Sequence, residues 1–285
     1  MPATVRNSRS VTADFPIIRL PAPGQAVPVI VSIPHFGCAP LPCITDEDYA
    51  DRMYRSFRFG YADAFADRIY GELHRQGATV IATPYSRLFV DLNRRRDDFQ
   101  CKDGEVRSKK GVFRTHTLYN NPVLKWPLSP ARAQWWLCRF YDPYYIALEA
   151  HTDSWLAAAG QALLIDGHTG SPRRLDGYEV VLGTGLGKYC HPDLTHAVQQ
   201  VLRGHGFACT ADLSGYRGGA VVRRFGRAEQ PLQAIQIEVN AGLIMRCSRR
   251  AYAESLKVGL TPAYDKNALQ ALQSAVADVV RSVGV

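Results

Sequence analysis

Short apolar runs that alternate with helical patterns constrain the fold of this chain more than any other feature. Four runs rich in β-branched and aliphatic residues predict strands: Val27–Ile33 (VPVIVSI), Thr79–Ala82 (TVIA), Ala162–Asp166 (ALLID) and Leu232–Val239. We expect further strands at Leu88–Leu92 (LFVDL) and near Val180. Strands that alternate with helices favour an α/β fold, with a mostly parallel, mixed central sheet and helices on both faces.

Helical patterns fill the stretches between these runs. We expect helices in four places, at residues 65–77, 129–159, 193–203 and 265–283. Pro143 predicts a kink in the second of them. Residues 94–128 show no clear periodicity. Because the chain contains no repeat, low-complexity tract or linker, we expect a single domain over residues 1–285.

The charge of the chain is unevenly distributed. It carries 34 Lys and Arg against 26 Asp and Glu, a net +8, and residues 87–114 hold nine basic and five acidic residues, a net +4. This excess favours an acidic ligand. A nucleic-acid-binding protein that uses the basic segments 87–114 and 217–227 is the alternative. No DNA- or RNA-binding motif accompanies these segments, so we expect no nucleic-acid partner.

The sequence also contains features that indicate the cellular compartment. No apolar run approaches the ~18 residues of a membrane span, and the first ten residues contain no apolar signal core. The seven cysteines form no C-x-x-C pair, as expected of free thiols in a reducing compartment. We therefore expect a cytoplasmic protein with no membrane partner, either a monomer or a small homo-oligomer.

Polar side chains follow the predicted strands. His35, Asn93 with Arg94, and His168 come directly after strands, and Glu238 lies near the end of another. Neighbouring parallel strands bring such residues to one edge of the sheet. Two histidines and a carboxylate form a ligand set of catalytic zinc, which keeps a fourth position open for water. A further glutamate can act as general base, and an arginine can hold a substrate carboxylate through two hydrogen bonds.

Five motifs, in this order along the chain, resemble the N-formylglutamate amidohydrolases, distant relatives of aspartoacylase and the zinc carboxypeptidases. They are VSIPHFG (31–37), SRLFVDLNR (86–94), LIDGHTGSP (164–172), GGAVVRRFG (218–226) and QAIQIEVNAGLIM (233–245). The resemblance covers residues 28–280. It implies an α/β fold of the zinc carboxypeptidase, phosphorylase/hydrolase-like type. It also implies zinc-dependent hydrolysis of an N-acyl acidic amino acid. The implied reaction converts N-formyl-L-glutamate to formate and L-glutamate, a step of histidine degradation.

The resemblance also implies a metal site. His35 and His168 match the two histidine ligands of one zinc ion. Asp63 matches the third ligand, because it precedes an R-I-Y motif (68–70) at the spacing found in the family. Asp63 can also be interpreted as an ordinary helix-start aspartate, because the positive end of the helix dipole stabilises a carboxylate without any metal. The alternatives for the third ligand are Glu47, Asp48 and Cys38.

Catalytic and substrate-binding roles follow from the same resemblance. Glu238, in the QIE motif, matches the general base, because zinc lowers the pKa of water toward ~7 and a carboxylate can then accept its proton. Arg87 matches the arginine that polarises the scissile carbonyl. The residues implied to bind substrate are Arg94, Asn93 and Arg223. Asp166, two residues before His168, can orient that histidine.

Two family patterns are altered in this chain. Arg224 stands where many members have the histidine of TRHYG, and Tyr145 stands where members have the histidine of PYH. Neither change touches the implied zinc ligands, but both favour a shifted substrate pocket. A different N-acyl amino acid or small amide is therefore the alternative substrate.

Overall fold

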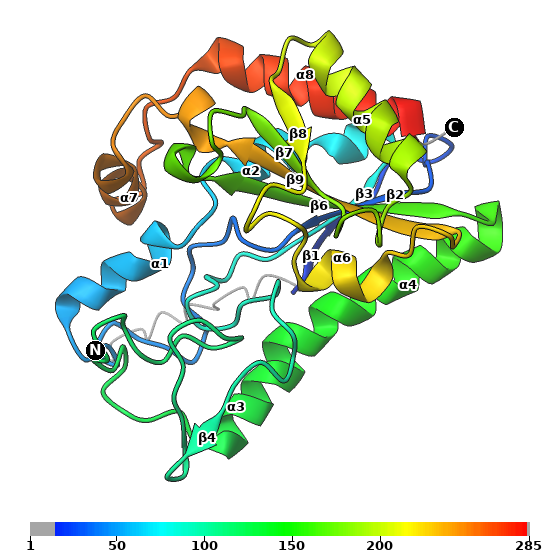
Figure 1. The fold of residues 1–285 in the computed structure, drawn as a ribbon. Helices are drawn as coiled ribbons and strands as arrows, with labels where there is room; N and C mark the ends of the chain where they lie inside the picture. The colour runs from blue at the N-terminus through cyan, green and yellow to red at the C-terminus, as the bar shows by residue number, and fades with distance from the viewer. Residues whose placement is uncertain (1–14, 284–285) are drawn as a thin grey trace, which may run out of the picture.

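The computed structural model describes residues 15–283, and seven strands of this part form one mixed sheet (Figure 1). In spatial order they are β1 (Ile17–Arg19), β3 (Thr79–Ala82), β2 (Val29–Ile33), β6 (Ala162–Gly170), β9 (Leu232–Asn240), β7 (Val180–Gly183) and β8 (Cys209–Ala211). The inner strands β3, β2, β6 and β9 are mutually parallel, whereas β1 and β7 run antiparallel to β3 and β9. The predicted mixed, mostly parallel sheet is confirmed.

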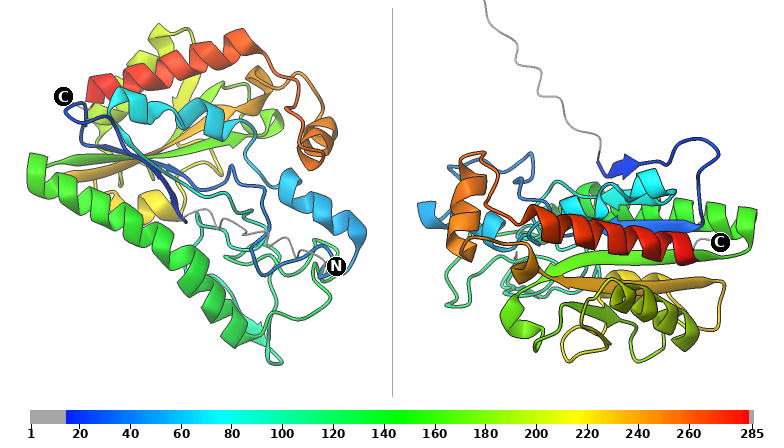
Figure 2. Two further views of the ribbon diagram at one scale, coloured as in Figure 1. Left: turned by 180° about the vertical axis from the view of Figure 1, so that it is seen from behind. Right: turned by 90° about the horizontal axis from the view of Figure 1, so that it is seen from above.

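Helices cover both faces of this sheet (Figure 1 and Figure 2). One face packs against α2 (Ala66–Tyr70), α5 (Pro192–Gly204) and α8 (Lys266–Val283). The other packs against α4 (Asp142–Ala159), which α3 (Pro130–Trp136) precedes, and against α6 (Ala220–Phe225). Two further short helices, α1 (Phe57–Gly60) and α7 (Arg249–Lys257), contact each other. Each face of the sheet thus has its own apolar core, as a parallel sheet requires.

The inner strands change from apolar to polar along the face that α4 and α6 cover. Because side chains alternate between faces, every second residue of a strand belongs to this face. Its apolar members near the strand beginnings are Ile30, Leu164 and Ala234. Further along the same strands it carries Ser32, Asp166, His168, Gln236 and Glu238, all buried. The polar groups therefore gather at the carboxyl ends of the parallel strands.

The strand predicted at residues 88–92 is wrong, because this segment forms a buried turn. The Ser86 hydroxyl accepts the amide of Leu88, the Ser86 carbonyl accepts the amide of Phe89, and the Asp91 carboxylate accepts the amide of Asn93. These local hydrogen bonds take the place of strand pairing. Phe89 consequently packs in the core, while Asp91 and Asn93 point to the polar edge of the sheet.

The long helix predicted for residues 129–159 forms, with an interruption near its middle. Ser129 caps its start by accepting the amide of Arg132. A π-helical turn, Leu137–Tyr141, lies just before Pro143, which cannot donate a helical hydrogen bond. Gly160 ends the helix in the left-handed conformation, with φ of 70°. The irregularity falls beside the predicted kink.

The remaining elements follow the sequence pattern with shifted boundaries. The pattern at residues 65–77 divides into α2 and a 3-10 turn (Leu73–Gln76). Residues 94–128 are irregular apart from the pair β4 (Cys101–Lys102) and β5 (Glu105–Val106). The short elements β1, β8, α6 and α7 are additions to the predicted set.

Within residues 15–283, none of the helices combines the length and the apolar character that a membrane crossing needs. The prediction about the first ten residues lies outside the described part of the chain.

Candidate metal centre and active site

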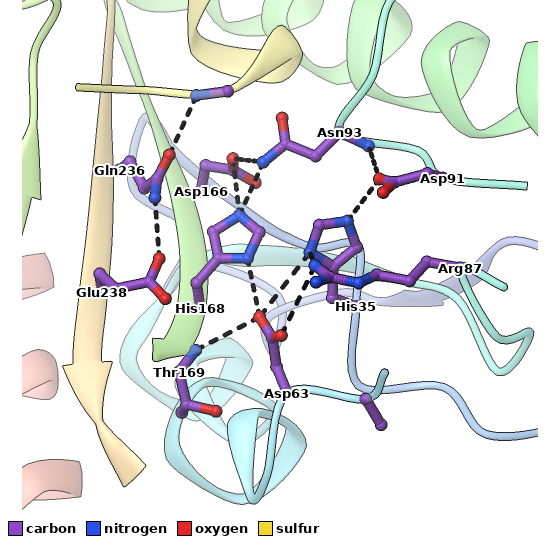
Figure 3. Close-up of polar contacts among 12 residues, drawn as sticks. His35, Asp63, Arg87, Asp91, Asn93, Asp166, His168, Thr169, Gln236 and Glu238 are labelled. Carbon is purple, nitrogen blue, oxygen red and sulfur yellow. Dashed lines mark hydrogen bonds and ion pairs between the residues drawn. The ribbon is translucent and has the colours of Figure 1, made fainter. Parts of the chain in front are cut away.

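Three buried side chains meet where the inner strands end (Figure 3). His35 follows β2, His168 lies near the end of β6, and Asp63 lies in the turn between α1 and α2. One candidate ligand atom from each residue lies within 4.8 Å of the other two. Asp63 Oδ2 is 2.8 Å from His168 Nδ1 and 3.8 Å from His35 Nδ1. Two imidazole nitrogens and a carboxylate oxygen so arranged can hold a metal ion.

The other nitrogen of each histidine contacts a second carboxylate. His35 Nε2 lies 2.7 Å from Asp91 Oδ1, and His168 Nε2 lies 2.9 Å from Asp166 Oδ2. An ionised carboxylate only accepts, so Nε2 of each ring carries a proton and donates it. Carboxylates in this position orient the ligand histidines of metal sites and leave the opposite nitrogen for the metal. Asp166 makes the contact that the sequence suggests, and Asp91 makes the equivalent contact for His35.

Asn93 connects this group to the first turn of α6 and to the glycine that precedes it. Its Nδ2 donates to Asp166 Oδ2 at 2.8 Å, and its Oδ1 accepts the amide of Val221 at 3.0 Å. A Cβ at Gly219 would lie 2.1 Å from Asn93 Oδ1, so this position requires glycine. The GG pair of the GGAVVRRFG motif thereby lets the loop approach the Asn93 amide.

The charges of the buried group follow from these contacts. Burial opposes a charge on His168, but Asp166 and Asp63 raise the pKa of its imidazole well above the usual value. Burial alone would raise the pKa of Asp63, but hydrogen bonds from His168 and His35 hold it well below its usual range. A metal ion on His168 Nδ1 would replace the proton that this pairing favours, so metal binding should weaken at low pH.

Glu238 lies directly beside His168, because the two residues are register partners on β9 and β6. Its Oε2 accepts a hydrogen bond from Gln236 Nε2 at 2.8 Å, and Gln236 Oε1 accepts the amide of Gly219 at 3.0 Å. Burial raises the pKa of the Glu238 carboxyl to about 7, and the charge of Asp63 acts in the same direction. A carboxylate with a pKa near neutrality is suited to accept and return a proton.

Of the three arginines expected in the site, Arg87 reaches the candidate ligands. Its Nη1 lies 2.6 Å from His35 Nδ1 and 3.8 Å from Asp63 Oδ1. Arg94 lies further out, with its Nε 3.9 Å from an oxygen of Asp91 and its side chain half-exposed. Arg223 is exposed on α6.

A tyrosine supports the strand that carries His168. The hydroxyl of Tyr70, on α2, lies 2.9 Å from the carbonyl oxygen of Ile237 and 3.2 Å from that of His168. A Cβ at Gly167 would lie 2.8 Å from the ring carbons of Tyr70. The glycine before His168 and the tyrosine of the R-I-Y motif are therefore a packing pair, which links two motifs that are distant in sequence.

The alternatives to Asp63 lie elsewhere. Glu47 is exposed, the carboxylate of Asp48 accepts an indole N–H at 2.7 Å, and the thiol of Cys38 lies 3.7 Å from a nearby backbone carbonyl. The amide of Asp63 donates to the carbonyl of His35 at 2.9 Å, which holds the two residues together. Among these four residues, Asp63 is the one that the fold brings to the histidines.

The two altered family positions contact each other. The guanidinium of Arg224, on α6, lies over the ring of Tyr145, on α4, at 5.2 Å, and it also pairs with Glu149. The hydroxyl of Tyr145 donates to the carbonyl of Leu92 at 2.8 Å, directly before Asn93. The substitutions thus join two helices and support the turn that carries Asn93, instead of lining the ligand group.

We expect Tyr145→Phe to lower the free energy of unfolding by about 1–3 kcal/mol, because it leaves the buried carbonyl of Leu92 without a donor. Urea unfolding followed by circular dichroism measures this change. Tyr119→Phe is the control, because Tyr119 is 90% exposed, and its stability should equal that of the wild type. Equal free energies of unfolding for both variants would show that the hydrogen bond from the Tyr145 hydroxyl does not stabilise the fold.

Two further residues of the site have no role implied by the family motifs: Gln236, which lies inside the QIE motif, and Arg114, which lies outside all five motifs. Gln236 lies two positions before Glu238 on the same strand face, so the strand periodicity is the signal that identifies it. Arg114 reaches Asp91 Oδ2 with its Nη2 at 3.4 Å, from the irregular segment 94–128. No local pattern indicates that contact, because Arg114 and Asp91 are far apart in the sequence.

Fold and site define the class of this molecule: an α/β protein with a candidate metal site at the carboxyl edge of its parallel strands. The family model of the N-formylglutamate amidohydrolases matches residues 27–245. The chain therefore belongs to the N-formylglutamate amidohydrolase family, and the resemblance stated from the sequence is confirmed.

Individual relatives agree with this assignment. The N-formylglutamate deformylases of Pseudomonas aeruginosa and Pseudomonas putida are 28% and 27% identical, over 75% of this chain and 80% of each relative. The crystal structure of an N-formylglutamate amidohydrolase from Ralstonia eutropha JMP134 superposes with a TM-score of 0.76. Its sequence is 21% identical, and the match covers 94% of this chain and 98% of that one. That structure shares the fold.

Proposed function

We propose that this chain is a zinc-dependent amidohydrolase that cleaves N-formyl-L-glutamate to formate and L-glutamate, in one catalytic domain. The observation that carries the proposal is the buried group of His35, Asp63 and His168 with Glu238 beside it. The names of the two Pseudomonas relatives support the substrate. The seven cysteines are free thiols, which fits the cytoplasm that the sequence suggests.

The donor set fits a zinc ion. His35 and His168 would each supply Nδ1, because Asp91 and Asp166 engage the Nε2 atoms, and Asp63 would supply a carboxylate oxygen. Two nitrogens and one oxygen suit Zn²⁺ better than Ca²⁺ or Mg²⁺, which prefer shells of oxygen. When bound, the ion would polarise the scissile carbonyl and lower the pKa of water toward neutrality.

The side chains of the protein would then perform the proton transfers and hold the substrate. Glu238 accepts the proton of the attacking water and returns it to the leaving amino group. Arg87 donates to the carbonyl oxygen as negative charge develops there. This donor is available because His35 Nδ1 cannot both bind a metal and accept from Arg87 Nη1. Arg94, with Asn93 beside it, binds a substrate carboxylate, and we assign no contact to the exposed Arg223.

Metal content tests this proposal directly. After stripping with a chelator and reloading, we expect about one equivalent of zinc in the wild type. We expect less than about a tenth of an equivalent in His168→Ala and Asp63→Asn, since each removes one of three ligands. His196→Ala, at an exposed histidine, should bind as the wild type does. A full equivalent in Asp63→Asn would move the ligand role to another residue, and metal-free wild type with full activity would overturn the proposal.

A further inference from the structure

A second guanidinium lies beside Arg94 at the outer side of Asp91. Arg114 Nη2 is 3.4 Å and Arg94 Nε is 3.9 Å from the same oxygen, Asp91 Oδ2. The other oxygen, Asp91 Oδ1, is taken by His35 and by the amide of Asn93. One carboxylate oxygen therefore faces two cations, a deficit of negative charge at this point of the site.

Arg114 is held in place by its own segment. The carbonyl of Val112 accepts the amide of Asp91 at 2.7 Å, which ties residues 111–115 to the turn that carries the site. Phe113 is fully buried and contacts the rings of Phe99 and Trp136. The position of Arg114 is thus set by packing on both sides, as recognition of a specific group requires.

Arg114 differs from the other basic residues of its segment. Its side chain is 11% exposed and lies over the ring of Tyr61 at 4.8 Å, whereas Arg107, Lys109 and Lys110 are exposed. Its Nη1 donates to the carbonyl of Lys109, and its buried Nε has no hydrogen-bond partner. The guanidinium shares its one carboxylate neighbour, Asp91, with Arg94, so its charge can bind a further anionic partner.

We propose that Arg114 binds the side-chain carboxylate of the substrate and so makes the enzyme selective for N-formyl dicarboxylic amino acids. This inference rests on the proposed function, and it identifies the residue that distinguishes dicarboxylic substrates from other N-formyl amino acids. Arg94 would then hold the other carboxylate of the same substrate. Two carboxylates of one substrate would supply the negative charge that Asp91 Oδ2 alone does not.

The proposed function assigns one substrate carboxylate to Arg94, which leaves the second carboxylate for Arg114. Both guanidiniums approach the same oxygen, Asp91 Oδ2, but they come from separate segments of the chain. Arg94 extends from the turn that carries the site, whereas Arg114 extends from the segment 111–115, which packs beside this turn. A substrate with two carboxylates can therefore engage both arginines at once.

The test compares two substrates that differ only in the side-chain charge, N-formyl-L-glutamate and N-formyl-L-glutamine. We expect the ratio of their kcat/KM values to fall by about 10- to 100-fold in Arg114→Gln, the usual worth of a charge-assisted hydrogen bond. Arg114→Lys should retain part of the preference. Lys110→Ala removes one charge from the same segment at an exposed position and should leave the ratio unchanged.

The zinc content of each variant and a binding measurement complete the test. If Arg114 only positioned Asp91, Arg114→Gln would lower activity on both substrates equally and would reduce the zinc content. Either this result or an unchanged ratio of the two kcat/KM values would overturn the inference. Calorimetric titration with L-glutamate and L-glutamine should show the same loss of preference without any turnover. Failure of the wild type to hydrolyse N-formyl-L-glutamate would instead overturn the proposed function.

Discussion

Replacement of Glu238 by glutamine should lower kcat by about two to four orders of magnitude, the usual contribution of a general base. The amide has nearly the same shape and can still accept the hydrogen bond from Gln236, but it cannot accept a proton from water. Because the Glu238 carboxylate is hydrogen-bonded to Gln236 and, among the described residues, forms no hydrogen bond or ion pair with His35, Asp63 or His168, zinc content and the circular dichroism spectrum should stay at wild-type values. Steady-state kinetics on N-formyl-L-glutamate measure the loss.

Glu254→Gln serves as the control, since Glu254 lies on the surface of α7 and should turn over as the wild type does. Near-normal kcat in Glu238→Gln would assign the proton transfer to another group. A loss of zinc in that variant would show that Glu238 supports the metal site instead.

The pH dependence of kcat/KM tests the role of Glu238 independently. Burial raises the pKa of Glu238 to about 7, and a base works only when it is deprotonated, so kcat/KM should fall as the pH drops. A bound zinc ion attracts the carboxylate charge, and we therefore expect the midpoint at or below pH 7. This limb should be lost in Glu238→Gln. If the acidic limb of the kcat/KM profile stays at the same pH in the variant, the titration of another group causes it.

Much of the architecture could be predicted from local patterns. The strands that carry His168 and Glu238 are apolar runs of ordinary type, and their parallel pairing places the two residues opposite each other. The 88–92 run has the same composition but forms a turn, because Ser86 and Asp91 supply hydrogen bonds that a strand would take from a neighbour. Composition alone does not distinguish a buried strand from a buried turn.

The parts of the site that no local pattern predicts depend on contacts between distant segments. Asp63 stands in an ordinary helix-start position, and its hydrogen bonds to residues distant in sequence, the His35 carbonyl and the His168 imidazole, hold it at the histidines. Arg114 is one of nine basic residues between positions 87 and 114, and its burial depends on how an irregular segment packs. A family resemblance can indicate the first of these residues, because a motif follows it. It cannot indicate the second, because no motif surrounds it.

The division of work between Arg87 and Arg94 can be tested through the separate kinetic constants. We expect Arg87→Ala to lower kcat by about 10²- to 10³-fold. Its Nη1 lies 2.6 Å from His35 Nδ1, at the proposed metal site, and a hydrogen bond from there to the substrate carbonyl would strengthen as charge develops.

Arg94→Lys should instead raise KM with little change in kcat. A lysine ammonium cannot hold a carboxylate through two parallel hydrogen bonds, and this contact acts on the bound substrate and on the transition state alike.

Zinc binding provides the decisive control for Arg87. Its guanidinium lies 3.8 Å from Asp63 and 2.6 Å from His35, so it also opposes a cation held by those residues. If Arg87 acts on the substrate, Arg87→Ala should bind zinc at least as tightly as the wild type, and added guanidinium ion should restore part of the lost kcat. A variant that loses zinc would show that Arg87 organises the ligands, and a rise in KM with kcat unchanged would exchange the roles of the two arginines.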